Sequence, residues 1–508
     1  MAGEYKRLIN GTAVNGLGLV VLALSGFFVI PIQIYYLGLE NFGLVVLGSM
    51  FSIQGLISVL DLGIPGAVTR QVASLRKDSE ICEIGVLYSS SIIIFLSIGL
   101  VLGSTLYLGS SLIASYFVKD ASDTAAMLAL GLQAVFISYI WQFPLLILKA
   151  QMQGFALFER LQLASVSVEA LRVIAIVTVL KFGYGFQYVI FCSALFPALE
   201  FLVLSCLCPT SFRVPSFING KQSLSKIALL SKQLFLGRLS GSFFNNSDKV
   251  VASIFFGPIG LGVIEVFTKM PALLNRVFGL SVSAIIPVVG GLSWPDDKDK
   301  IANIYHVGFK TYFIVICFPI LQLIYFTPEV LNLWIGQEDR DLITCMQLML
   351  LWTLLVPLAF GGNILIALNR GVQKLTKIRI VLAVLKVLSL IVLVTGVGIY
   401  AIPLSYLISC VAYISLLALF KNMINISLRR QMLDYFRIII GASGPILGYH
   451  LFFGVLDPTR LAGLLVSIVL ITGSQILVIY FLALSEKERI VVKHFISSRL
   501  VRFSQTGP

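Results

Sequence analysis

Apolar segments of twenty or more residues recur along the whole chain, and this feature limits the fold more than any other. Each segment is long enough to cross a hydrocarbon core of roughly 30 Å as a helix. Apolar residues make up 58% of the chain and charged residues only 12%, which is outside the range of soluble proteins. The strands of a membrane β-barrel would be about ten residues long with alternating polarity, so a barrel is excluded. The sequence therefore predicts an all-α integral membrane protein.

Glycines, prolines and charge clusters divide the chain into about 14 predicted transmembrane helices. The first is interpreted as a retained span, because its apolar stretch is longer than that of a signal peptide and no small-residue cleavage site follows. The predicted spans lie near residues 12–36, 42–68, 83–108, 125–148, 160–181, 185–208, 232–256, 260–292, 303–326, 342–368, 376–397, 399–420, 436–454 and 460–484.

The basic residues indicate the orientation of these spans. With both termini in the cytoplasm, 26 of the 37 Lys and Arg residues fall in inner loops and tails. Only Lys119, Lys181, Arg340 and Arg460 fall outside, which fits the positive-inside rule. The formal charge of +13 is therefore a topology signal, and nucleic acid is not an expected partner. Contact with anionic membrane lipids is a secondary expectation.

Two halves of the chain match without gaps. The segment YYLGLENFGLVVLGSMF aligns with IFFGPIGLGVIEVFTKM at an offset of 219, which pairs Gly38 with Gly257 and Gly43 with Gly262. A second match, KAQMQGFALFERL with IALNRGVQKLTKI, has an offset of 217. The offsets favour duplication of a six-helix unit, although chance matching of apolar sequence is the alternative. Because six is even, the repeats are parallel, and such repeats usually enclose a substrate site.

This duplication predicts four parts. Residues 1–208 form the first six-helix half, 209–231 a cytoplasmic linker and 232–421 the second half. Residues 422–508 add two transmembrane helices and a basic cytoplasmic tail. The expected architecture encloses a cavity that opens inward and outward in turn.

Motifs for catalysis are missing from the sequence. The three histidines do not form an H-E-x-x-H motif, and no Walker-type phosphate loop is present. The sequence DKD at residues 297–299 lies in a short loop and is interpreted as a solvated turn. The seven cysteines lack the spacing of a zinc site or a disulfide framework. We therefore expect neither an enzyme nor a cofactor or metal.

Charged residues inside the predicted spans are the strongest functional signal. Each costs roughly 2.5 to 3.5 kcal/mol on insertion scales, so it usually faces a bundle interior or a wet cavity. In the segment RLSGSFFNNSDKVV, Arg238, Asn245 and Lys249 are spaced by 7 and 4 and share one helix face. Asn246 and Asp248 lie in the same segment.

The next predicted span carries a similar stripe, since Glu265, Lys269 and Arg276 are spaced by 4 and 7. Glu169 and Arg172 are three positions apart and can pair. At the offset of 217, Glu169 aligns with Lys386, which suggests a polar interior shared by both halves.

The spans hold more cations than acids. The cations are Arg172, Arg238, Lys249, Lys269, Arg276, Lys310 and Lys386, and the acids are Asp61, Glu169, Glu200, Asp248 and Glu265. A cationic interior suits an anionic ligand, because Arg and Lys replace its hydration shell. The alternative is that paired charges only fix helix packing. Asp61 and Arg70 form either a gate or interfacial charges.

The chain resembles a known family in two blocks. IYYLGLENFGLVVLGSMFSIQGLISVLDLGIPGAVTRQVA is similar to the first block of the O-antigen and polysaccharide flippases. These belong to the multidrug, oligosaccharidyl-lipid and polysaccharide exporter superfamily. NNSDKVVASIFFGPIGLGVIEVFTKMPALL resembles the block that opens their second half. The resemblance covers nearly the whole chain, but its individual motifs are loose.

The resemblance implies a bacterial inner-membrane flippase for undecaprenyl-pyrophosphate-linked oligosaccharide, coupled to a proton or sodium gradient. It also implies pathway partners, namely a polysaccharide polymerase and glycosyltransferases. The alternatives are a multidrug exporter, a peptidoglycan-precursor flippase or, from another class, a membrane polysaccharide polymerase or ligase. The expected substrate-binding residues are Arg172, Arg238, Asn245, Asn246, Lys249, Lys269, Arg276 and Lys386. The residues expected to serve coupling or charge balance are Asp61, Glu169, Asp248 and Glu265.

Overall fold

The computed structural model describes ten stretches of the chain, and every regular element in them is a helix, as predicted. The stretches are residues 2–52, 55–77, 81–118, 122–208, 217–283, 285–336, 339–368, 372–424, 428–452 and 461–482. The α-helices are α1 (Ala2–Met50), α2 (Ile64–Lys77), α3 (Ile81–Leu108), α4 (Ser110–Phe117), α5 (Ser122–Ile137), α6 (Tyr139–Gly154), α7 (Phe158–Lys181), α8 (Phe186–Leu207), α9 (Phe217–Phe255), α10 (Gly257–Ser283), α11 (Ile285–Gly290), α12 (Lys298–Tyr325), α13 (Thr327–Ile335), α14 (Arg340–Leu355), α15 (Phe360–Ala367), α16 (Val372–Val397), α17 (Ala401–Ser409), α18 (Val411–Ile424), α19 (Leu428–Phe452) and α20 (Leu461–Leu482). Short 3₁₀ helices are η1 (Leu56–Asp61), η2 (Val356–Ala359) and η3 (Gly398–Tyr400).

The chain is a multi-pass membrane protein. Among the described residues, nine helical segments are long and apolar enough to cross a bilayer, or ten if the bent pair α5 and α6 counts as one span. One of the nine, Gln373–Ile424, has 52 residues. At 1.5 Å per residue its length is about 78 Å, far more than one crossing needs. Gly398, with a φ of 60°, breaks this segment. The predicted number of 14 spans stays a prediction.

The repeat seen in the sequence is also a repeat of helices. At the offset of 217, both ends of α3 align with the ends of α12, and the start of α4 aligns with the start of α13. The aligned glycines Gly38 and Gly257 adopt left-handed φ angles of 73° and 63°. This conformation is readily open only to glycine, and at each position one helix ends and the next begins. A glycine with positive φ therefore stands at a helix junction at matching points of the repeat.

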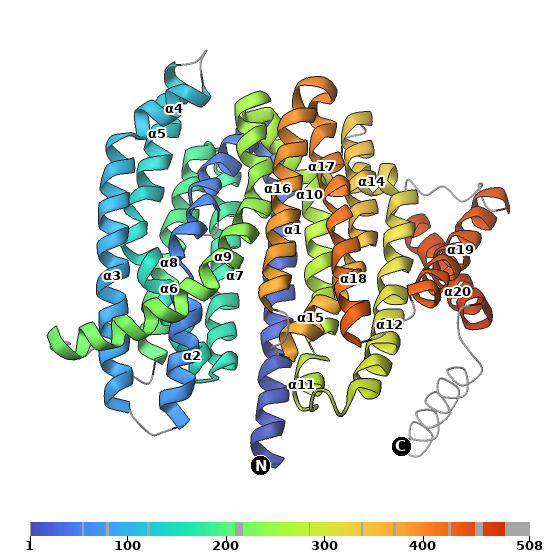
Figure 1. Cartoon of the computed structure of the whole chain (residues 1–508). Coiled ribbons are helices and arrows are strands. Elements are labelled where there is room, and N and C mark those ends of the chain that lie inside the picture. Colours follow the sequence, from blue (N-terminus) through green and yellow to red (C-terminus); the bar gives the residue numbers. More distant parts are fainter. Residues whose placement is uncertain are drawn as a thin grey trace, which may run out of the picture. The chain divides into compact units, whose positions relative to one another are not determined.

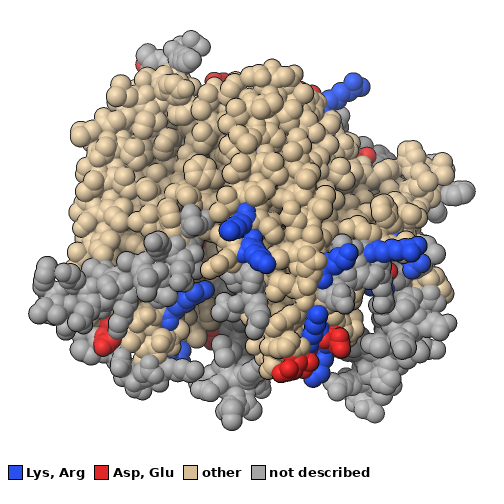
Figure 2. Space-filling model, viewed as in Figure 1, with Lys and Arg blue, Asp and Glu red and all other residues tan. Residues whose placement is uncertain are grey.

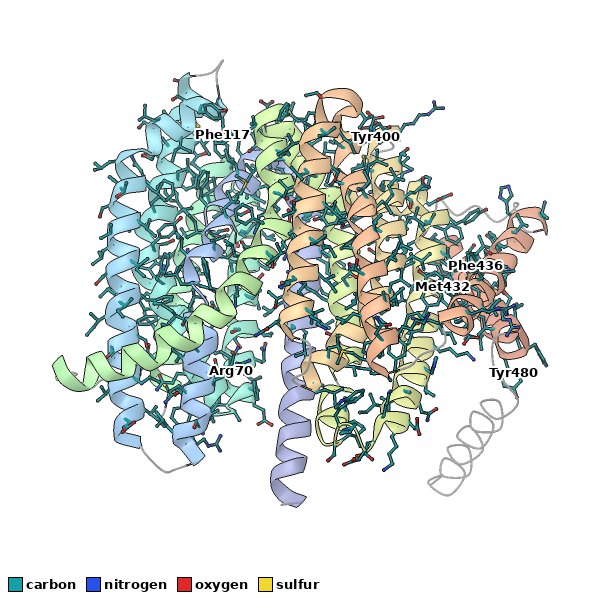
Figure 3. The ribbon with its side chains drawn as sticks, viewed as in Figure 1. Arg70, Phe117, Tyr400, Met432, Phe436 and Tyr480 are labelled. Carbon is teal, nitrogen blue, oxygen red and sulfur yellow. The ribbon has the colours of Figure 1, made fainter. Side chains whose placement is uncertain are left out.

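Contacts divide the chain into two units, and the first comprises residues up to Val277 together with Gln373–Ala412. In this unit α3 packs on α5 and α6, α1 on α7, and α7 on α8 (Figure 1). Arg70 lies at one end of the helices of this unit, whereas Phe117 and Tyr400 lie at the other (Figure 3). This placement agrees with the loop alternation that the charge pattern predicts.

The second unit comprises Phe278–Val372 and the chain from Tyr413 onward. Here α12 packs against α14 and α19, and α19 packs against α20. A buried cluster joins the end of α12 to α19 and α20, and its members are Phe326, Ile446, Tyr449, Leu464 and Ile471. The two last helices are therefore anchored to α12 by an apolar core.

The two units do not follow the predicted boundaries at 208, 232 and 421, which were inferred from the repeat and stay predictions. Of the predicted linker, residues 209–216 lie outside the described stretches and the remainder begins α9.

Apolar side chains cover the outer faces of the long helices. On α16, Leu388, Ile391 and Val392 are all more than half exposed. In the upper part of the view in Figure 2, the surface is largely free of charged residues. Such faces are compatible with hydrocarbon, so charged residues within the spans need another explanation.

Candidate functional site

The second predicted span, residues 42–68, is not a continuous helix. Helix α1 ends at Met50, η1 covers Leu56–Asp61, and α2 begins only at Ile64. Leu62 and Gly63 adopt left-handed φ angles of 51° and 74° between η1 and α2. Irregular backbone at membrane depth is tolerated only where it is buried in protein or lines a wet cavity. In transporters, such broken helices often form binding sites.

Helix α9 places a row of polar side chains against this break. Arg238 Nη1 donates to Asp61 Oδ2 at 2.5 Å. The hydroxyls of Ser242 and Ser58 lie 2.8 Å apart, and Asn246 Nδ2 lies 3.5 Å from the Gly55 carbonyl oxygen. The polar residues of α9 thus contact two side chains and one backbone carbonyl of the break. The sequence left Asp61 and Arg70 as a gate or as interfacial charges, and in the structure Asp61 pairs with Arg238.

A second charged cluster joins α9 to α10. Glu265 accepts from Lys249 Nζ at 2.8 Å and from Lys269 Nζ at 3.0 Å. The predicted stripes on the two helices therefore meet at one carboxylate, which leaves one net positive charge. Arg276, from the same stripe, is exposed and makes no ion pair with a described residue. Asn245 is also exposed.

Lys386 is fully buried, and its ammonium group lies among groups from α9 and α17. Its Nζ is 3.6 Å from Asp248 Oδ1 and 3.8 Å from the ring centroid of Tyr406. It also donates to the backbone carbonyl of Phe244. Tyr406 Oη donates to the other carboxylate oxygen of Asp248 at 3.2 Å. Lys386 is therefore enclosed by protein groups, and its predicted role in substrate binding stays a prediction.

Glu169, which the offset of 217 aligns with Lys386, holds a position equivalent to that of Lys386. Glu169 Oε1 accepts from Ser25 on α1 at 3.0 Å, while Lys386 donates to Phe244 on α9. Ser25 and Phe244 are themselves related by the offset of 219. Glu169 also accepts two hydrogen bonds from Arg172, at 2.6 and 2.8 Å, as their spacing predicted. The two polar positions thus keep the register of the repeat.

One ion pair escaped the sequence analysis. Lys149 Nζ lies 2.7 Å from Glu200 Oε1, which also accepts from Ser165 at 2.6 Å. Lys149 was assigned to an inner loop, so no signal placed it near Glu200. With this pair, each of the five acids assigned to spans is bound to a Lys or Arg.

The described residues offer no metal site, since no three His, Cys, Asp or Glu side chains come together there. Asp297, in the DKD sequence, accepts from Lys300 at 2.7 Å and from the Ser293 N–H at 3.0 Å. These hydrogen bonds lower the pKa of the Asp297 carboxyl. Such bonds are those of a loop turn, in line with the sequence interpretation.

A family model described as "Polysaccharide biosynthesis protein" matches residues 8–292, which is more than half of the chain. The chain belongs to this family. No curated protein sequence matches this polysaccharide biosynthesis family member.

Solved structures show its fold. The chain is similar to the lipid II flippase MurJ in an inward closed conformation, with a TM-score of 0.71, 13% identity, and coverage of 92% of this chain and 98% of that one. It is also similar to an inward-facing multidrug resistance MATE transporter of the MOP superfamily, with a TM-score of 0.62, 16% identity, and coverage of 82% and 93%.

A MOP superfamily transporter from Pyrococcus furiosus, whose structure is described as having a binding pocket of reverse polarity, gives a TM-score of 0.57. It is 15% identical, and the match covers 82% of this chain and 98% of that one. At such low identities these similarities establish the fold alone. The family member has the fold of MOP superfamily transporters.

Proposed function

We propose that this protein is a flippase that moves an undecaprenyl-pyrophosphate-linked oligosaccharide, such as an O-antigen repeat unit, from the cytoplasmic to the periplasmic leaflet. It works in a bacterial inner membrane with both termini in the cytoplasm, by alternating access driven by a proton or sodium gradient. The observation that carries this proposal is the set of cations on α9 and α10: Arg238 pairs with Asp61 at a broken helix, and Lys249 and Lys269 share Glu265.

The chemistry of these cations supports an anionic head group. Arg238 is half exposed, and its planar guanidinium suits bidentate contacts with phosphate. Lys249 and Lys269 share a single carboxylate, so one positive charge there is not neutralised by Glu265. Asn245 is exposed and offers an amide to sugar hydroxyls. Membership of a polysaccharide biosynthesis family agrees with a glycan on the carried lipid.

A multidrug exporter shares this fold, but its usual substrates are lipophilic cations. Such substrates favour an unpaired carboxylate, and each acid assigned to the spans is already bound to Lys or Arg. A peptidoglycan-precursor flippase would recognise the same diphosphate lipid and differ only in the glycan. A polymerase or ligase would need a catalytic constellation, which the sequence does not provide.

Deletion of the gene tests the proposal. We expect loss of surface polysaccharide and accumulation of lipid-linked glycan that only cytoplasm-facing reagents reach, with restoration by the intact gene. Normal surface polysaccharide together with increased dye retention would favour drug export. Accumulation of peptidoglycan precursor in place of the glycan would favour the other lipid flippase.

A further inference from the structure

The polar contacts between α9 and η1 form a matched series. On α9 the participants Arg238, Ser242 and Asn246 recur at every fourth position, close to one turn of an α-helix. Their partners Asp61, Ser58 and Gly55 recur at every third position, which is one turn of a 3₁₀ helix. Residue numbers rise along α9 while those of the partners fall, and the two series stay in register over three contacts. We call this series the α9–η1 zipper.

The ion pair at the end of the zipper is asymmetric. The Asp61 side chain is 8% exposed, whereas that of Arg238 is 50% exposed. Both oxygens of Asp61 are engaged, because Oδ1 accepts from the Gly63 N–H at 2.8 Å and Oδ2 accepts from Arg238. A guanidinium has five N–H donors in a fixed fork. A second anion can therefore approach Arg238 from its open side.

We propose that Asp61 is an internal counter-anion for Arg238, and that a diphosphate group arriving at Arg238 takes its place and opens the α9–η1 zipper. The proposal rests on the proposed function for the natural substrate, but it concerns only the diphosphate chemistry. Arg binds phosphate bidentately, and such charge-assisted bonds are about twice as strong as neutral ones. The arriving charge also repels the Asp61 carboxylate.

Displacement of Asp61 from Arg238 would also move η1. Asp61 would be left as a buried charge without its cation, which is strongly unfavourable, so η1 must move until water reaches the carboxylate. The remaining zipper contacts are single neutral hydrogen bonds and oppose this movement weakly. The left-handed residues Leu62 and Gly63 mark the point where the backbone changes direction. Ligand binding and zipper opening are then thermodynamically linked.

Disulfide formation across the zipper tests this link. The full chain carrying Ser58→Cys and Ser242→Cys, whose parent hydroxyls lie 2.8 Å apart, is placed in nanodiscs with a mild oxidant. Mass spectrometry of the cross-linked peptide reports the rate, so the native cysteines can stay. Inorganic pyrophosphate is the probe, and sodium chloride at equal ionic strength controls for screening. We expect pyrophosphate to slow cross-linking at least about fivefold, the lower end of typical coupling.

Variants of Asp61 and Arg238 distinguish displacement of Asp61 from a general loosening of the α9–η1 zipper. With Asp61→Asn, pyrophosphate should bind at least as tightly but no longer change the cross-linking rate. With Arg238→Gln, both binding at this site and the response should disappear, whereas Arg238→Lys should keep a weaker response. If Asp61→Asn does not give monodisperse protein, the two Arg238 variants still decide the outcome.

A second cysteine pair is the matched control. Ser110 and Gln133 are hydrogen bonded at 3.2 Å between α4 and α5 of the same unit. Pyrophosphate should leave cross-linking of Ser110→Cys with Gln133→Cys unchanged. An equal effect at both pairs, no effect at the zipper, or a full response with Asp61→Asn would each overturn the proposal. Because pyrophosphate carries neither sugar nor lipid, this result is independent of the gene-deletion test.

Discussion

Gly43 and Gly262 are matching positions of the repeat, and each packs against the backbone of the helix that carries the other. A Cβ atom on Gly43 would lie 1.8 Å from the carbonyl oxygen of Pro258, and one on Gly262 would lie 2.7 Å from that of Leu39. Leu39 and Pro258 are related by the same offset of 219 as the two glycines, so the contact is reciprocal, as at a two-fold interface. Small residues in membrane helices permit such close approach.

Gly43→Ala should therefore destabilise the protein by about 1–3 kcal/mol or more, because backbone atoms cannot yield as a flexible side chain does. Gly262→Ala should cost less, since its contact is longer. Thermal unfolding of purified protein measures both. Gly241→Ala on α9 is the control, because its Cβ would meet nothing within 4 Å. Equal melting temperatures for all three variants would contradict the reciprocal contact.

Lys386→Met should destabilise the protein by roughly 3–5 kcal/mol, because it leaves Asp248 buried without a cation. The double variant with Asp248→Asn should recover much of this loss, since the amide can still accept from Tyr406. A double-mutant cycle by thermal unfolding gives the coupling energy. Additive losses would show that the two side chains do not interact. Leu388→Met, on the exposed face of α16, is the control.

Cysteines at Ser74 and Ser115 should react with impermeant thiol reagents from opposite sides of the membrane. Both serines are exposed, on α2 and α4, near Arg70 and Phe117, which lie at opposite ends of the first unit (Figure 3). The charge pattern predicts that Ser74 faces the cytoplasm. Labelling of intact spheroplasts checks this prediction. Labelling of Ser74→Cys from the periplasmic side would show that the topology is opposite to the predicted one.

Arg276→Ala should abolish surface polysaccharide while the protein stays at its normal level in the membrane. Arg276 is exposed and has no ion partner among the described residues, so its removal leaves no buried charge behind. Arg276→Lys should restore export in part, because a point charge remains without the bidentate fork. Polysaccharide blots with quantified membrane protein measure both effects, and the exposed Lys421→Ala serves as the control.

Arg238→Ala should also abolish export, but it leaves Asp61 buried without a cation, so a loss of protein is expected as well. Arg238→Lys keeps the pair and should export in part at a normal protein level. Normal export by the combined Arg238→Gln and Arg276→Gln variant would mean that these charges serve only packing.

The sequence alone determined the helical class and revealed the repeat, and its charge pattern predicts the alternation of loops. In a bilayer, the backbone N–H and C=O groups of apolar segments find hydrogen-bond partners only in helices or closed barrels. Because the segments lack the alternating polarity of barrel strands, helices remained. Matching glycines at 38 and 257 revealed the duplication, because both turns need a left-handed residue. Local spacing also predicted the contact of Glu169 with Arg172 and placed Glu265 and Lys269, which are paired in the structure, on one stripe.

Only the tertiary structure decided which distant charges meet. Helical spacing gives the face on which a side chain lies, but not the helix opposite, so the partners of Arg238 and Lys386 could not be read from it. The break in the second span could not be predicted either, because an apolar sequence is compatible with a continuous helix and with a broken one. Asp61 and Arg238 lie far apart along the chain, and only packing brings them together.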